Sequence, residues 1–477
     1  MDQQIIKWTD KIIYWSFVLI VFLVPIIFLN NITLSFELPK SSLFRMLTIV
    51  IWIGLLIKLL IKKNISLSIP SKFTQISLAG FMITAILATI YSISPHLSFF
   101  GSYERQQGLL QLFFYISFFT ATIIFFSTNK EKIFSLIKVA CYSAALISII
   151  AILQKIFPQL TATIWHTEDL LGRVQGTLGQ PNFLGSYLII LVPFFIAQFF
   201  LHETNKHKLI QVILLTFVIT AIILSGSRAA ILALTGELII FSLYWNKKIF
   251  AGLAGIIIIS SIILLPRFTF ENENLRAVKT RLITWQTTIH QIAEKPFLGY
   301  GQETFRESFK KFQPKEIFLY EKFGTELDRA HNEILDTTAE IGLVGLIFYL
   351  IFYLNIIKAG FLNKKNILIL AASSSLIGLF IANMFGFSTT THRIFFWLLA
   401  GIIIALTQKI KNFKIKIDRT ITVILIMILV FFAFKTAINQ GVADYYYRQS
   451  INSSMEMRDF EAIDYIQKAT KTNPYQN

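Results

Sequence analysis

The chain has 477 residues, of which 55% are hydrophobic and only 15% are charged, and its mean hydropathy is +0.63. Soluble proteins carry about 25% charged residues, so this composition excludes an ordinary soluble enzyme and indicates a polytopic membrane protein. The net charge of +17 fits either a polyanion-binding surface or the charge asymmetry of a membrane topology.

Apolar runs long enough to cross the ~30 Å hydrocarbon core recur along the chain. Thirteen of them centre on residues 12–29, 43–61, 74–92, 108–127, 133–156, 183–201, 209–224, 229–245, 249–265, 337–357, 367–385, 393–407 and 420–438. We therefore predict an all-α polytopic fold with about 12–13 transmembrane helices. The first run follows lysines but has no small-residue cleavage site, so we expect it to remain as the first helix.

Basic residues gather on alternate connections between these runs. With the N-terminus in the cytoplasm, the inward connections hold only three acidic residues, Glu131, Glu203 and Asp418. Their sixteen basic residues are Lys62, Lys63, Lys130, Lys132, Lys206, Lys208, Lys247, Lys248, Lys358, Lys364, Lys365, Lys409, Lys411, Lys414, Lys416 and Arg419. This excess follows the positive-inside rule and predicts a cytoplasmic N-terminus and an extracytoplasmic C-terminus. It favours topology over nucleic acid binding as the reason for the basicity.

The single cysteine, Cys141, lies inside the fifth run. It excludes a disulfide within the chain and a thiolate metal cluster, and we expect it to be a buried core residue. The outward histidines show neither HxxxH nor HExxH spacing, so no metal site and no cofactor are predicted.

The longest outward connection, residues 266–336, holds eleven basic and eleven acidic residues. A connection of this length is expected to carry structure of its own, so we predict a folded, mostly helical cap on the outer face. No linker separates it from the spans. The expected organisation is one membrane domain over residues 1–438 and a helical tail over 439–477.

Arginines stand at the outer membrane edge, whereas nearly all inward basic residues are lysines. The guanidinium fork matches phosphate oxygens better than an ammonium does. Each arginine alone has a structural alternative, such as an ion pair with a neighbour or snorkelling to the interface. As a set they indicate an outer cavity for a phosphate-bearing group: Arg105, Arg173, Arg228, Arg276, Arg281 and Arg393.

The stretch "RAHNEILDTTAEIGLVGLIFYL", residues 329–350, places His331 at the end of the cap beside the next membrane helix. A neutral imidazole there is a candidate base for an incoming hydroxyl, and a hydrogen-bonded structural histidine is the alternative. Asp336 and Glu340 either orient His331 and nearby arginines or form a structural ion pair. Gly342, Gly345 and Ala339 are expected to let a neighbouring helix approach closely.

This stretch resembles the signature of the bacterial O-antigen ligase and polymerase superfamily. In that family a periplasmic loop ends in a His-Asn pair and a Glu-x-Gly-x-x-Gly entry into the next span follows, here His331, Asn332, Glu340, Gly342 and Gly345. Further matching blocks are "GSYERQQGLL", "GTLGQPNFLGSYL", "SGSRAAILAL" and "RLITWQTTIHQIAEKPFLGYGQETF". Together they span residues 90 to 400.

The resemblance implies a fold of the C-type glycosyltransferase kind with an active site beneath a periplasmic cap. It implies transfer of a glycan from an undecaprenyl-diphosphate carrier to an acceptor hydroxyl, without a metal. The acceptor that the resemblance implies is another glycan, a lipid A–core or a protein. The implied catalytic residues are His331, Arg228 and Arg281, with Arg276 and Lys279 close to the last position. Substrate-binding candidates are Arg105, Arg173, Asn182, Arg276, Asn332, Asp336 and Glu340.

Other functions remain open at this point. A repeat-unit polymerase or a protein-glycosylating ligase would use the same chemistry on another acceptor. A lipid flippase also needs a cationic cavity, but transporters often show internal repeats and mid-membrane charges, which this sequence does not display. The tail, "RDFEAIDYIQKATKTNPYQN", resembles the second helix of a tetratricopeptide repeat with Ala462, Tyr465, Ala469 and Pro474. A single amphipathic hairpin is the alternative, and a repeat array would continue beyond Asn477.

Overall fold

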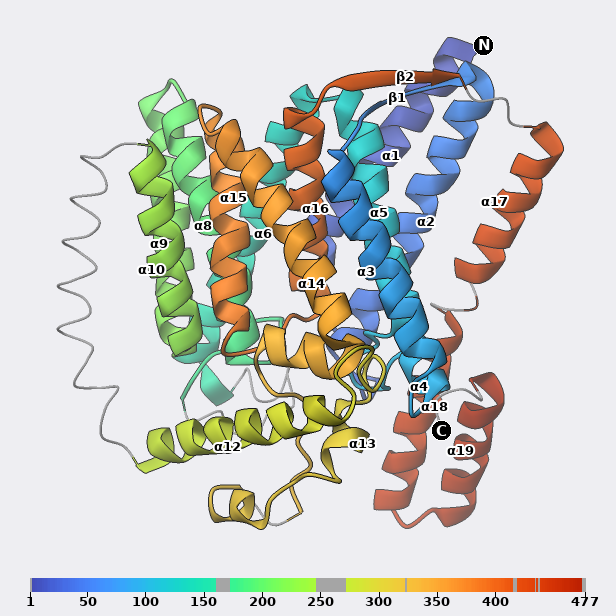
Figure 1. Ribbon diagram of the computed structural model, residues 1–477, viewed down its shortest axis with the longest axis vertical. Helices are drawn as coiled ribbons and strands as arrows, with labels where there is room; N and C mark the ends of the chain where they lie inside the picture. Colours follow the sequence, from blue (N-terminus) through green and yellow to red (C-terminus); the bar gives the residue numbers. More distant parts are fainter. Residues whose placement is uncertain are drawn as a thin grey trace.

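The computed structural model describes residues 2–159, 172–245, 272–321, 324–414, 418–433, 435 and 438–473. Most of these residues form a bundle of long helices, and further helices cover one end of it (Figure 1).

Within the described ranges, ten helices are long and apolar enough to cross a membrane. They are α1 (Asp2–Ile26), α2 (Glu37–Lys62), α3 (Lys72–Ile90), α5 (Leu109–Thr128), α6 (Glu131–Ile156), α8 (Pro181–Leu201), α9 (Asn205–Ser225), α10 (Arg228–Trp245), α14 (Glu333–Leu362) and α16 (Thr390–Thr407). Two shorter apolar helices, α15 (Ile367–Asn383) and α17 (Arg419–Ala433), coincide with two more predicted runs. The predicted helical membrane fold is confirmed. The ninth predicted span, 249–265, lies outside the described residues.

Two short strands depart from the all-α prediction. β1 (Asn64–Ser68) pairs antiparallel with β2 (Ile410–Lys414), and Ser66 lies opposite Asn412. The strands connect two loops more than 300 residues apart at the end of the bundle opposite the cap (Figure 1). Their pairing satisfies backbone groups that leave a helix. Each strand is only five residues long, so the sequence alone offered little periodicity to detect.

The core of the bundle is rich in phenylalanine. Phe17 of α1 lies 5.0–5.7 Å, between ring centroids, from Phe118, Phe125 and Phe126 of α5. Offset and edge-on arrangements of this kind suit the ring quadrupole. Cys141 is buried in the same core and accepts a hydrogen bond from Gln198 at 3.1 Å, as expected for a core residue.

The cap consists of α12 (Asn272–Glu294), α13 (Phe305–Phe309) and the 3₁₀ helix η1 (Lys315–Leu319). In Figure 1, α12 lies across the end of the bundle at which α10, α14 and α16 begin. Its Trp285 packs with Phe305, Phe309 and Ile317 in a small separate core. The predicted mostly helical structure of this segment is therefore confirmed for its described residues, and its place on the outer face stays a prediction.

The tail forms a hairpin of α18 (Asn439–Met455) and α19 (Asp459–Thr472) at the same end as the cap (Figure 1). Tyr446 and Tyr465 stack across it, with ring centroids 6.3 Å apart. The hairpin is attached to the bundle by Arg45 of α2, whose Nη1 donates to Gln440 Oε1 at 3.0 Å. Asp444 accepts a second bond, from the backbone N–H of Leu34 at 3.2 Å. The helix boundaries agree with both predicted forms of the tail.

Candidate functional site

The site is built around the first turns of α14, where the membrane helix is interrupted. Gly342 has φ +73° and ψ 174° inside α14. A Cβ at this position would lie 2.0 Å from the carbonyl oxygen of Phe297. Only glycine combines this backbone conformation with such a close approach.

A cap loop, residues 296–301, fills the interruption. The N–H of Leu343 donates to Pro296 O at 2.7 Å, and the N–H groups of Tyr300 and Gly301 donate to the carbonyls of Ala339 and Glu340 at 2.9 Å. These bonds satisfy backbone groups that the broken helix leaves unpaired, which hydrocarbon would not do. The predicted close approach to Gly342 therefore occurs, but its partner is a loop and not a neighbouring helix. Gly345 contacts the side chain of Ile341 in its own helix.

The backbone before α14 is held in a strained conformation at His331, which has φ +54°. Its neighbour Ala330 is fixed on both sides: the N–H donates to Asp336 Oδ1 at 2.7 Å, and the carbonyl accepts from Trp285 Nε1 at 2.9 Å. Asn332 then caps α14 by accepting from the N–H groups of Ile334 and Leu335 at 3.1 and 3.2 Å. Strain maintained by such contacts is typical of functional sites.

Arg329 joins the cap loop to α14 in a buried network. It forms ion pairs with Glu303 and with Glu340, the latter at 2.5 Å. Glu340 also accepts from the backbone N–H of Glu303 at 3.0 Å. Glu340 Oε1 thus contacts both the guanidinium of Arg329 and the N–H of Glu303, and Glu340 forms the structural ion pair that was one of the two interpretations of its sequence position. Its predicted contact with substrate remains a prediction.

His331 lines a cavity of about 470 Å³, which we call the histidine cavity. It lies between the cap and the bundle. Its charged lining is balanced, with three carboxylates and three guanidinium groups: Glu37, Glu104, Asp328, Arg105, Arg329 and Arg393. A cavity of this size suits a small-molecule or glycan substrate.

Arg105 forms one wall of the histidine cavity. It forms an ion pair with Asp328, and its guanidinium lies 3.9 Å from the ring centroid of Phe387. The ring of His331 lies 5.3 Å from that of Phe387. Burial alone would raise the pKa of Asp328, but the charge and hydrogen bond of Arg105 outweigh it and hold that pKa below its ordinary value.

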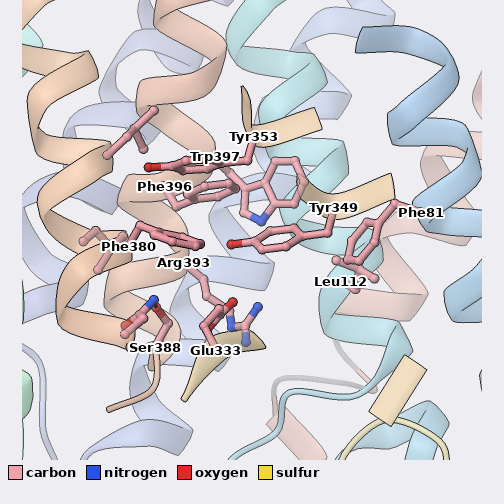
Figure 2. Close-up of a pocket in the computed structure, with 13 residues that line it drawn as sticks. Phe81, Leu112, Glu333, Tyr349, Tyr353, Phe380, Ser388, Arg393, Phe396 and Trp397 are labelled. Atoms are coloured by element: carbon pink, nitrogen blue, oxygen red, sulfur yellow. Dashed lines mark hydrogen bonds between the residues drawn. The ribbon is translucent and has the colours of Figure 1, made fainter. Parts of the chain in front are cut away.

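Arg393 was recognised in the sequence as an outward arginine but was not chosen as a site residue. It lines the histidine cavity and also a smaller cavity of about 30 Å³ beneath it. Figure 2 shows its guanidinium beside Glu333, under a group of aromatic rings that includes Tyr349 and Trp397. Arg329 begins the stretch 329–350 but was not chosen either, and its position two residues before His331 was the available signal.

Three further arginines gather beside the cavity. Arg173 donates from Nε to Ser225 O at 2.8 Å and from Nη2 to Asn182 Oδ1 at 2.9 Å. Gly226, with φ +59°, allows this approach to the α9–α10 turn. Burial and the charge of Arg228 lower the pKa of Arg173, and the same two causes lower the pKa of Arg281. Arg228 therefore lies close enough to both residues for its charge to act on them, although the three come from different connections.

Neighbouring like charges of this kind cost free energy unless an anion neutralises them. No ion pair links Arg173 or Arg281 to a carboxylate in the part of the chain that the structure describes. The cluster of Arg173, Arg228 and Arg281, which we call the arginine cluster, can therefore hold an anion such as a diphosphate.

The protonation state of His331 follows from its position between these groups. Burial, opposed by Asp328 but reinforced by Arg281, Arg105 and Arg329, lowers its pKa to about 4. The imidazole is therefore neutral near pH 7 and able to accept a proton. Because the charge of Arg281 acts on the imidazole, the histidine cavity and the arginine cluster interact electrostatically.

The remaining predicted residues lie as follows. Asn182 is engaged with Arg173, and Asn332 serves as the cap of α14 while its Nδ2 donates to Met384 O at 3.3 Å. Arg276 is exposed in the first turns of α12. Asp336 supports the backbone of Ala330. Among the described residues, no group of three His, Cys, Asp or Glu side chains is placed to hold a metal ion.

Comparison with known proteins matches residues 212–350 to the family described as "O-Antigen ligase". This segment runs from α9 into α14 and contains Arg228, Arg281 and His331. A protein of Rickettsia conorii named "Putative polysaccharide ligase" is 30% identical over 159 residues, covering 31% of this chain and 38% of the relative. One of Rickettsia felis with the same name is 26% identical over 219 residues, covering 43% and 52%. The chain thus spans about half, or less, of the length of these relatives.

Proposed function

We propose that this multi-pass membrane protein, whose residues 212–350 belong to the O-antigen ligase family, transfers a glycan from an undecaprenyl-diphosphate carrier to an acceptor hydroxyl. The reaction would take place on the outer face of the bacterial cytoplasmic membrane, beneath the cap. The observation that carries the proposal is a half-buried histidine, neutral near pH 7, in a cavity that lies near an arginine cluster.

The steps follow from these residues. An imidazole nitrogen of His331 removes the proton of the acceptor hydroxyl. The oxygen attacks the anomeric carbon, the bond from that carbon to the diphosphate breaks, and the lipid diphosphate leaves with the electron pair. Attack from the face opposite the leaving group inverts the configuration. Negative charge develops on the departing diphosphate, and the arginine cluster is placed to stabilise it.

The proposed test uses the purified protein in detergent with an undecaprenyl-diphosphate glycan, an acceptor and EDTA. Release of lipid diphosphate and the coupled product are measured. We expect wild-type transfer to persist in EDTA and the His331→Ala variant to lose it by about 10²–10⁴-fold. His290→Ala is the matched control, because His290 is exposed on α12 of the same cap.

The test also discriminates between the rival functions. Undiminished turnover in His331→Ala would refute the base assignment. With the protein reconstituted in liposomes, movement of the lipid-linked glycan across the membrane without cleavage would instead identify a flippase. Offering a lipid A–core, a second repeat unit or a peptide as acceptor separates a ligase from a polymerase and from a protein-glycosylating enzyme.

A further inference from the structure

A second cavity, which we call the tail cavity, adjoins the histidine cavity at the cap end. It encloses about 380 Å³ between α2, the connection before it, the residues leading into α8, and α18. Glu37, Glu104, Gly179 and Phe183 line both cavities. A molecule bound in the tail cavity would therefore contact residues that also line the histidine cavity.

The tail hairpin contributes Arg448 to this cavity. Gln440, Asp444 and Arg448 are four residues apart and so share one face of α18. The first two are bonded to Arg45 and to the backbone of Leu34. These bonds hold the hairpin against the bundle and keep the third residue over the cavity. No ion pair of Arg448 is found within the described ranges.

The polar lining is suited to hydroxyl groups. Glu37 Oε1 and Thr33 Oγ1 are buried atoms for which the described structure offers no hydrogen-bond partner. Glu37 and Thr33 both line the cavity, and carboxylate and hydroxyl groups of this kind can form hydrogen bonds with the hydroxyls of a ligand. Phe36 and Phe183 supply aromatic surface beside these atoms. Carboxylates, hydroxyls and aromatic rings together match the alternating polar and apolar surfaces of a sugar.

The charge of the tail cavity argues against the diphosphate. Two carboxylates, Glu37 and Glu104, face one arginine, Arg448. None of the residues of the arginine cluster lines it. In Figure 1, α18 and α10, which begins with Arg228, stand on opposite sides of the bundle. A hydroxyl that displaces a diphosphate with inversion must come from the side away from the leaving group.

We infer that the tail cavity is the acceptor subsite, that it takes a neutral saccharide portion of the acceptor, and that Arg448 determines acceptor binding. The inference rests on the proposed function, because it assigns the second substrate of the same reaction. It gives the tail hairpin a role in the choice of acceptor.

The experiment measures binding separately from chemistry. A fluorescently labelled neutral trisaccharide and inorganic pyrophosphate are each titrated into the purified full chain. The variants are Arg448→Ala, Arg448→Lys and Arg228→Ala. The control is Arg458→Ala, since Arg458 lies on the same hairpin but is exposed and pairs with Glu456 and Glu461.

We expect Arg448→Ala to weaken trisaccharide binding roughly 10- to 100-fold, the effect of one charge-assisted hydrogen bond, and to leave pyrophosphate binding unchanged. Arg228→Ala should do the reverse, and Arg458→Ala should affect neither. In the transfer assay, Arg448→Ala should raise the KM for the acceptor and not that for the donor.

Unchanged trisaccharide binding in Arg448→Ala, or no binding by the wild type, would overturn the inference. Weakened pyrophosphate binding in that variant would identify the tail cavity as a phosphate site and overturn it as well. The thermal unfolding of Arg448→Lys is compared with that of the wild type. An unchanged unfolding temperature shows that substitution at this position does not cause a folding defect. Failure of the proposed function is distinct, because wild-type protein would then release no lipid diphosphate in the transfer assay.

Discussion

At the scale of single residues, the arginines of the site fall into two groups: some form ion pairs with carboxylates, and others lie beside further arginines. Arg329 and Arg105 have carboxylate partners, Glu303 with Glu340 and Asp328 respectively. The ion pairs of Arg329 hold the cap on α14, and that of Arg105 joins the end of the cap to the connection before α5, so neither arginine has much charge left for a ligand. Arg173 and Arg281 form no ion pair with a carboxylate among the described residues, which makes the arginine cluster the better place for an anion.

The arginine cluster can be tested by substitution. Arg228→Ala and Arg281→Ala should each reduce kcat/KM for the lipid-diphosphate donor about 10²–10³-fold, the usual effect of removing one group that stabilises developing negative charge. Arg→Lys should also fail, because lysine keeps the charge but loses bidentate contact. Initial rates at varied donor concentration give the measurement. Arg276→Ala, an exposed position on the same helix α12 as Arg281, should retain activity; a reversal of these two would move the assignment to Arg276.

The pH profile tests His331. A general base acts in its neutral form, and the pKa of His331 is lowered from 6.5 to about 4. As the pH falls, kcat/KM should therefore stay level through 6.5 and decline only as the pH approaches about 4. Rates measured in constant ionic strength buffers, with protein integrity checked at each pH, give the profile. A midpoint at or above 6.5 would show that the imidazole is not held as the structure places it.

At the scale of elements, α14 shows how a membrane helix becomes part of a site. The break at Gly342 leaves backbone N–H and C=O groups of α14 without partners in the helix. The backbone of the cap loop, residues 296–301, forms hydrogen bonds with these groups. The same loop carries Glu303 a few residues on, which pairs with Arg329. The cap is thereby joined to the membrane helix on both sides of His331.

The Gly342→Ala variant tests this junction. The φ of +73° and the 2.0 Å approach of Phe297 O leave no room for a Cβ, so the loop should separate from the helix. We expect a lower thermal unfolding temperature in detergent, with strain alone costing about 1–3 kcal/mol. Gly441→Ala is the control, since nothing lies within 4 Å of its Cβ position. Equal stability of the two variants would contradict the role given to the break.

At the scale of the whole molecule, the arrangement separates two kinds of basic residue. The cap, the arginines of the site and the tail hairpin lie at one end of the bundle, and the strands β1 and β2 with their lysines lie at the other (Figure 1). The positive-inside rule assigns the lysine end to the cytoplasm. This orientation remains a prediction, and the outward location of the proposed reaction depends on it.

Topology reporters inserted into the full chain test the orientation. Lys364 lies in the turn between α14 and α15, and Lys311 lies in the cap. Alkaline phosphatase inserted at Lys311 should be active, because it folds only outside the cytoplasm, and at Lys364 it should be inactive. The opposite pattern would place the site in the cytoplasm and remove access to an outward-facing lipid-linked glycan.

The sequence by itself determined the membrane fold, because each span is a local run of apolar residues whose length must match the bilayer. It also placed the arginines and His331 at one end, since alternation of the spans fixes the side of every connection. The tertiary structure decided which groups meet. The partners of Arg329, the loop beside Gly342, the pairing of β1 with β2 and the contact of Arg448 with the tail cavity join distant segments. No local period records such contacts, because they arise only when the packed helices bring unpaired backbone and charged groups together and burial makes each of them require a partner.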